Sequence, residues 1–279
     1  MAIIKTAKYL IGTNSSISPT RKKTKFQGYA NVEEMLAAVG FVETFPNKYK
    51  LANTTYGTRG GYPSCIKHIF LHHSATEMDK GTGNMINIFN SRGVASSHRG
   101  IDGLGNIETI LEDKLRANCQ AVDGYMFNTS GMSVELIALG WVKNKLQDDG
   151  TYLQGDVKIA ADKTALAVDF NENPKSYKGF ERFAAYTQPQ VDATVKLIRE
   201  WGKLYKIPFV FNQEQFNLMF PPKSKLNTKW LKNITTTKGV FTHNTVKGTK
   251  SDIFPDPLLI KTFKKEFAPG NSLDPANLK

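Results

Sequence analysis

An apolar run that ends in two histidines most constrains how this chain of 279 residues folds. The residues Ile-Phe-Leu at 69–71 favour a β-strand and bury well, so residues 66–72 are predicted to form a buried strand. His72 and His73 follow at the end of that strand, where α/β folds usually place their chemistry. Because the chain has only five histidines, this pair predicts a functional site.

A second histidine stands far downstream in a similar setting. His243 follows the short apolar run 239–242, and Lys250 and Asp252 come soon after it. Two distant histidines and an aspartate suit a catalytic zinc site, in which three protein ligands leave a fourth position for water.

Five motifs in order resemble those of the zinc-dependent N-acetylmuramoyl-L-alanine amidases, a superfamily that includes phage lysins, cell-wall recycling amidases and peptidoglycan recognition proteins. The resemblance covers roughly residues 64 to 265. It implies an α/β fold, with a central mixed β-sheet flanked by helices. Its motifs are His72 to Thr76, the stretch from Ser97-His98 to Asn106, Gly131 to Leu139, Tyr186-Thr187 with Gln190, and Thr242-His243 with Lys250 to Asp252.

The resemblance implies that zinc is held by His72, His243 and Asp252. The family's ligand is the first residue after the apolar strand, which favours His72 over His73. In an alternating strand these two side chains point to opposite faces, so both cannot easily bind one ion. His73 remains an alternative ligand, and otherwise we expect it to support the site or to face the substrate.

Glu135 is the only charged residue in the predicted strand 131–139. A carboxylate in such a run is costly unless it is paired, exposed at a sheet edge or used near a metal. Several family members place a catalytic glutamate here, and others use a tyrosine just before the histidine that matches His98. Because that position is Ser97, the resemblance favours Glu135 as general base. His98 itself is expected to be mainly structural.

Two further residues are expected to act at the site by the same resemblance. Lys250 would stabilise the oxyanion, although a solvated loop lysine is the alternative. Many family members carry a histidine that contacts the scissile region before the glutamate strand, and here Asn118 is expected to take its place. An asparagine can donate a hydrogen bond but cannot carry a proton, so we expect Asn118 to bind substrate.

The helix and turn signals predict the elements around these motifs. Helices are expected to begin at Asn31, to cover 85–90, to run from a Thr187–Gln190 capping box to Tyr205, and to span 258–267. Turns at 102–106 predict a hairpin. Residues 1–60 are predicted to be an N-terminal extension, a basic arm plus a short helix. Residues 61–279 would form the amidase domain, with insertions near 140–185 and 209–238. Phe216 and Phe220 in the second insertion either pack in the core or line a groove.

The net charge of +12 favours an anionic partner such as a bacterial wall with its acidic polymers, or it serves solubility alone. The sequence lacks a basic repeat interleaved with aromatic residues, which would indicate nucleic-acid binding. It also lacks a segment apolar enough to span a bilayer. Lys5 and Lys8 interrupt the apolar N-terminus, so no signal peptide is expected. We expect a monomer that stays in the host cytoplasm until lysis or is carried by a virion, and that acts on peptidoglycan.

The expected reaction is hydrolysis of the amide between N-acetylmuramic acid and L-alanine by a phage endolysin or virion-associated hydrolase. The alternative is a peptidoglycan-binding protein of the same fold that does not cut. Non-catalytic relatives typically lose the third ligand, so the presence of Asp252 with Lys250 favours catalysis. An unrelated nucleic-acid-binding protein is the remaining hypothesis.

Overall fold

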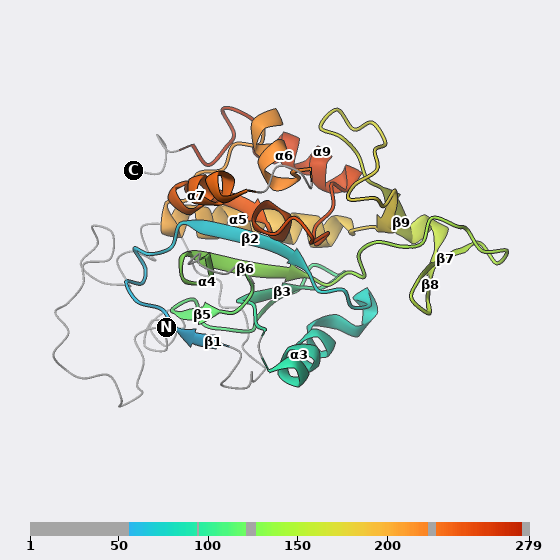
Figure 1. Ribbon diagram of the computed structural model, residues 1–279, viewed down its shortest axis with the longest axis horizontal. Coiled ribbons are helices and arrows are strands. Elements are labelled where there is room, and N and C mark those ends of the chain that lie inside the picture. The colour runs from blue at the N-terminus through green and yellow to red at the C-terminus, as the bar shows by residue number, and fades with distance from the viewer. Residues whose placement is uncertain (1–55, 94, 121–126, 223–226, 275–279) are drawn as a thin grey trace.

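The computed structural model describes residues 56–93, 95–120, 127–222 and 227–274. A five-stranded sheet lies at its centre, with strand order β11-β2-β6-β3-β4 (Figure 1). Neighbouring strands are parallel except for β4, which pairs antiparallel with β3. The prediction of an α/β fold with a central mixed sheet is therefore confirmed. The strands are β2 (His68–His73), β3 (Arg99–Ile101), β4 (Ile107–Thr109), β6 (Gly131–Leu136) and β11 (Gly239–Thr242).

The alternation of side chains along β2 divides the molecule into two layers. Ile69 and Leu71 point into the largest core cluster, which also receives side chains from α5 (Gln188–Tyr205) and α9 (Pro257–Glu266). Phe70 points the other way and packs with residues of α4 (Phe127–Ser130) and α7 (Thr228–Thr236). His72 has the parity of Phe70, so it lies on the face opposite α5.

The predicted helix after Thr187 is confirmed as α5, but its capping box is not. The Thr187 hydroxyl accepts a hydrogen bond from the Gln190 backbone N–H at 3.2 Å, as expected of the N-cap. The Gln190 side chain does not reach back to the cap. Its amide donates to the carbonyl oxygens of Ile101 and Ile137, at 3.0 and 3.2 Å. A buried amide requires hydrogen-bond partners, and the buried carbonyl oxygens at the ends of two strands provide them.

The other predicted elements appear with modest shifts. Helix α3 (Gly81–Arg92) starts earlier than expected, and Gly93, with a left-handed φ of 65°, is its C-cap. The hairpin turn at 102–106 joins β3 to β4. Helix α9 matches the expected C-terminal helix. The helix expected from Asn31 lies outside the described residues.

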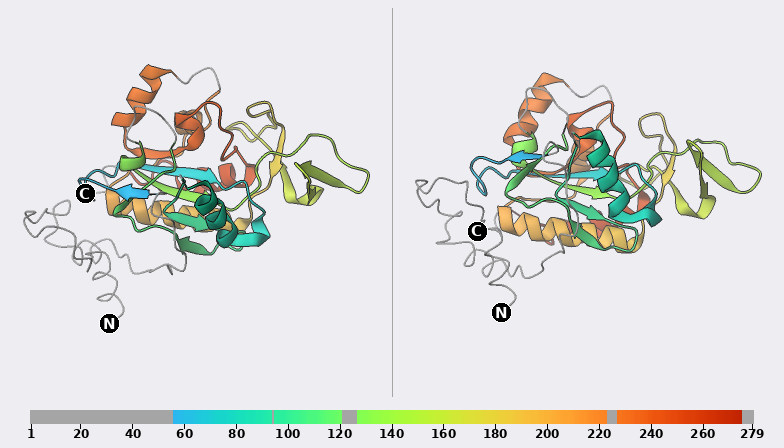
Figure 2. Two further views of the ribbon diagram at one scale, coloured as in Figure 1. Left: turned by 60° about the horizontal axis from the view of Figure 1, so that its bottom comes forward. Right: turned by 90° about the horizontal axis from the view of Figure 1, so that it is seen from below.

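The range 140–185 carries β9 (Thr164–Leu166), β10 (Arg182–Ala184) and a hairpin of β7 (Thr151–Gln154) with β8 (Val157–Ala160), which projects from the body in Figure 2. The range 209–238 holds α6 (Gln213–Met219) and α7. Phe216 and Phe220 lie in the main core, so core packing is their role. Within the described ranges, no helix combines the length and apolarity needed to cross a membrane. The short elements are β1 (Tyr56–Thr58), β5 (Leu115–Ala117), α8 (His243–Val246) and 3-10 turns at Met78–Lys80 and Ala161–Lys163.

Candidate metal centre

Parallel pairing of β2 with β11 brings two histidines together at the C-terminal ends of these strands. Leu71 pairs with Thr242, so the next residues, His72 and His243, emerge side by side. Their imidazole ring centroids are 4.7 Å apart, at an interplanar angle of 60°. Strand order, rather than nearness in sequence, therefore joins the two motifs.

A constrained loop between α8 and α9 delivers the aspartate. The Asn244 side-chain amide donates to the carbonyl oxygens of Asp252 and Ile253, and the Ile253 N–H donates to His73 Nδ1 at 3.3 Å. Ile253 is fully buried with φ of 50°, a conformation that is costly for a β-branched residue. Such backbone persists only where surrounding contacts hold it, and here it turns the Asp252 carboxylate toward the histidines.

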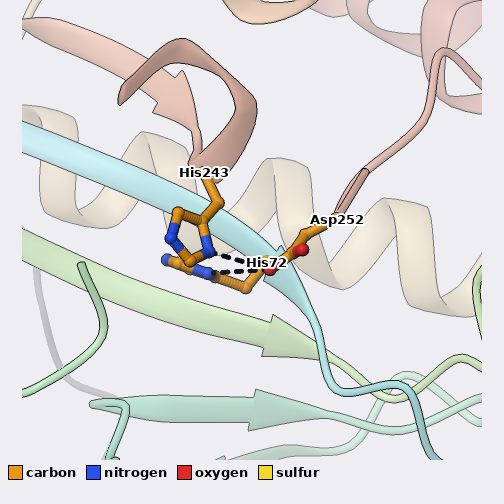
Figure 3. Close-up of side chains that lie close together, drawn as sticks. All are labelled: His72, His243 and Asp252. Atoms are coloured by element: carbon orange, nitrogen blue, oxygen red, sulfur yellow. Dashed lines mark hydrogen bonds and ion pairs between the residues drawn. The ribbon is translucent and has the colours of Figure 1, made fainter. Parts of the chain in front are cut away.

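The three side chains converge at the distances that a small metal ion requires. Asp252 Oδ2 lies 2.9 Å from His243 Nδ1 and 3.6 Å from His72 Nδ1 (Figure 3). The candidate ligand atoms of all three residues lie within 4.8 Å of one another. Tetrahedral zinc with bonds of about 2.0–2.1 Å separates its ligand atoms by about 3.3 Å. The observed separations bracket that value.

The chemistry of the donor set also fits a metal. Both imidazoles direct a nitrogen at one carboxylate oxygen, and His72 and His243 are only 2% and 5% exposed. His243 Nε2 is buried and has no hydrogen-bond partner among the residues that the structure describes. Two neutral imidazoles and a carboxylate leave a site of net positive charge with an open coordination position. That is the pattern of catalytic zinc sites, and iron(II) also accepts it.

Glu135 lies next to the triad because of the β2–β6 register. It pairs with His72 on one side and with Gly100 on the other. Paired residues of parallel strands point to the same face, with backbones about 4.8 Å apart. Burial raises the pKa of Glu135 to about 7, against the opposing charge of His72 and with the support of Asp252. A carboxyl group with this pKa can both accept and return a proton near neutrality.

The triad residues perturb one another strongly. Burial alone would lower the pKa of His72, but the charge of Glu135 and the hydrogen bond with Asp252 raise it to about 10. Burial lowers the pKa of His243 to about 4, with partial opposition from Asp252. Burial acts to raise the pKa of Asp252, but hydrogen bonds from both histidines hold it well below its usual value. Clustered shifts of this kind are typical of functional sites.

Lys250, His73 and Asn118 are the remaining predicted site residues. The charge of Lys250 is among the lesser influences on the pKa of Glu135 and of His243. His73 is 8% exposed and supports the Asp252 loop through Ile253, on the face opposite His72. Asn118 bonds to Ser96 through its main chain. Contact of His73, Asn118 or Lys250 with substrate stays a prediction.

His98 is structural, as expected. It is fully buried, and its ring bonds to the Arg59 guanidinium at 2.9 Å and to the Ser133 hydroxyl at 3.1 Å. Burial, helped by the charge of Arg59, lowers the pKa of His98 to about 3. A neutral ring buried in this hydrogen-bond network fits a structural role.

Gln120 is a residue beside the triad that the motifs missed. Its Nε2 lies 2.7 Å from His72 Nε2, and the side chain is buried. It stands two positions beyond Asn118 in the sequence. Residues 118–120 form neither helix nor strand, so their sequence has no periodicity that would indicate which side chain faces the sheet.

Comparison with known proteins finds similarity at the level of structure only. No family model and no curated protein match the chain. The N-acetylmuramoyl-L-alanine amidase LysC from Clostridium intestinale URNW is 12% identical, and the match covers 78% of this chain and 97% of that one, with a TM-score of 0.40. The amidase AmiD from E. coli, in complex with a muramyl peptide substrate, is 13% identical over 80% of this chain and 97% of its own, with a TM-score of 0.34.

AmpDh3 from Pseudomonas aeruginosa, in complex with anhydromuramic pentapeptide, is a third similar structure. It is 15% identical, and the match covers 70% of this chain and 57% of that one, with a TM-score of 0.34. The chain thus spans little more than half the length of AmpDh3. These distant likenesses are to proteins of the kind that the sequence motifs resemble.

Proposed function

We propose that this chain is a zinc-dependent amidase that hydrolyses the bond between N-acetylmuramic acid and L-alanine in peptidoglycan. The observation that carries the proposal is the convergence of His72, His243 and Asp252, with Glu135 paired beside His72. Three metal ligands and one adjacent carboxylate can supply the Lewis acid and the general base of metal-assisted hydrolysis. The substrate class follows from the order of the sequence motifs.

Each residue then has a separate task in the reaction. Zinc, when bound, would lower the pKa of water toward about 7 and polarise the scissile carbonyl. Glu135 removes a proton from the attacking water as the new C–O bond forms at the lactyl carbonyl carbon. When the C–N bond breaks, Glu135 returns this proton to the departing alanine nitrogen. Lys250 offers a full positive charge to the oxygen that becomes negative between these steps.

Mass spectrometry of purified sacculi after digestion tests the proposal, because it identifies the bond that is cut. We expect peptides with a free L-alanine amine and glycan strands with free lactyl carboxyl groups. Glu135→Gln should give far less of both products while retaining metal. Cleaved glycosidic or peptide cross-link bonds would overturn the assignment. Binding to sacculi without any cleavage by the zinc-loaded protein would favour the non-catalytic alternative.

We extend the proposal to a lytic setting, in which the enzyme is a phage endolysin or a virion-associated wall hydrolase. The net charge of +12 supports this, because it attracts the protein to the acidic polymers of intact walls. Turbidity measurements on whole wall preparations should show clearing that weakens as salt is raised. Activity confined to small soluble muropeptides would contradict the lytic setting and leave the amidase chemistry intact.

A further inference from the structure

We infer that Gln120 is a positioning residue for the metal ligand His72, with its side-chain amide oxygen accepting the His72 Nε2 proton when metal is bound. This inference rests on the proposed metal site. Gln120 touches neither the reacting bond nor the ion. Its effect would act through the orientation and the tautomer of one imidazole.

The first observation is the position of the Gln120 amide. Gln120 is 4% exposed, and its Nε2 lies 2.7 Å from His72 Nε2. Gln120 Oε1 is buried without a hydrogen-bond partner in the described ranges. A buried amide oxygen without a partner is costly, so a functional state in which it is satisfied is expected.

The second observation is which nitrogen of His72 faces the other ligands. His72 Nδ1 lies 3.6 Å from Asp252 Oδ2 and therefore points into the triad. A metal bound at Nδ1 uses that lone pair, so the proton must sit on Nε2, the nitrogen that faces Gln120. Metal-binding histidines almost always donate this remaining proton to an acceptor, which fixes the ring and raises its basicity.

A carboxamide can serve both states of the imidazole. In the structure, Gln120 Nε2 is the amide atom that faces His72 Nε2, and it can donate to that nitrogen whenever the nitrogen is unprotonated. A half-turn of the amide exchanges its NH₂ and its oxygen, two groups of nearly the same shape. After that turn Oε1 occupies the place 2.7 Å from His72 Nε2 and accepts its proton. The same side chain therefore pairs with either tautomer.

The base of the Gln120 side chain is held firmly. The Asn128 side-chain oxygen accepts hydrogen bonds from the backbone N–H of Cys119 and of Gln120, at 3.1 and 2.7 Å. Asn128 belongs to α4, which leads directly into β6. A chain of contacts thus runs from Asn128 through Gln120 to His72. A ligand supported in this way is preorganised for metal.

Zinc affinity measured by competition with a chromophoric chelator tests the inference on the full chain. Gln120→Met keeps the length of the side chain but removes the acceptor, and it should weaken zinc binding by about 10–100-fold. Gln120→Glu keeps an acceptor and should bind zinc at least as tightly as the wild type. Gln213→Met, a change at an exposed glutamine, is the matched control and should leave affinity unchanged.

Nuclear magnetic resonance of the zinc-loaded protein measures the exchange rate of the His72 Nε2 proton, which general destabilisation of the fold would not change selectively. The Nε2 proton of His72 should exchange slowly in the wild type and in Gln120→Glu, and fast in Gln120→Met. If Gln120→Met does not fold, the wild type and Gln120→Glu still carry the test.

The outcomes separate the two proposals. Equal zinc affinity in wild type and Gln120→Met, or equal losses in Gln120→Met and Gln120→Glu, would overturn the role of Gln120 and leave the metal site standing. A wild-type protein that binds no zinc would overturn both.

Discussion

Glu135 on β6 stands directly beside His72 on β2, as its register partner in a parallel pair. Both side chains therefore project from one face of the sheet, and strand spacing of about 4.8 Å sets how far apart their backbones lie. A candidate base and a candidate metal ligand are thus placed by two paired strands of the central sheet. The third ligand, Asp252, comes from a loop that needs its own supports from Asn244 and His73.

Metal content tests the triad directly. We expect about one zinc per chain in the purified protein, and Asp252→Ala should lose both metal and activity, because two histidines alone form a weak site. Elemental analysis and chelator titration provide the measurement. Retained lysis by Asp252→Ala would mean that the third ligand is misassigned, and iron in place of zinc would correct the identity of the ion.

Substitution of Glu135 should separate chemistry from metal binding. Glu135→Gln keeps the size of the side chain but cannot accept the proton, so we expect activity to fall by about 10²–10⁴-fold with zinc retained. Glu181→Gln, at an exposed position, is the matched control. Product release from sacculi, together with zinc content, checks the result. Full activity in Glu135→Gln would assign the base elsewhere.

A pair of glycines offers a test of the Asp252 loop. Gly140 has φ of 91°, and an added Cβ would lie 2.6 Å from His73 Nε2. Gly150 has φ of 77°, with nothing within 4 Å of such a Cβ. Gly150→Ala should cost about 1 kcal/mol of unfolding free energy from backbone strain. Gly140→Ala should cost clearly more and should also weaken zinc binding, because it displaces His73 and with it Ile253.

Urea unfolding and chelator competition measure these two effects. Equal losses of stability in the two variants would mean that His73 accommodates the added methyl group at residue 140. The Asp252 loop would then not depend on close packing between Gly140 and His73.

The stability of the zinc-free protein should fall as pH drops below about 6.5. Burial lowers the pKa of His98 to about 3 and that of His68 to about 4, with the charge of Arg59 adding to the effect at His98. The unfolded chain takes up these protons near pH 6.5, whereas the folded chain does not until far lower pH. Each histidine therefore contributes stability that is present above pH 6.5. That contribution is lost at up to about 1.4 kcal/mol per pH unit as pH falls toward the folded pKa.

Urea midpoints between pH 7 and pH 5, measured in chelator, check this dependence. His68→Gln should remove the contribution of one histidine to the pH dependence, so its unfolding free energy should fall less steeply with decreasing pH. The variant should also be less stable than the wild type at pH 7. An unchanged slope in His68→Gln would show that His68 is not held neutral in the folded chain.

Local pattern was sufficient for most elements, whereas the triad was implied by the resemblance of the ordered motifs to the amidase family. The buried strand before His72, the N-cap of α5 at Thr187 and the strand around Glu135 each depend on residues close in sequence, so periodicity and capping signals reveal them. The site required more. Gln120 meets His72 across 48 positions, and Ile253 meets His73 across 180, through contacts that no local period encodes.

Tertiary structure alone decided which polar groups face one another. The Gln190 side chain was expected to cap α5, but it donates instead to the carbonyl oxygens of Ile101 and Ile137, because strands β3 and β6 end beside it. Glu135 became the neighbour of His72 only through the β2–β6 register. Amino-acid sequence by itself determined which segments are strands and helices and which side chains can bind metal. Strand order and register determined which of those side chains meet, because they set distances between residues that are remote along the chain.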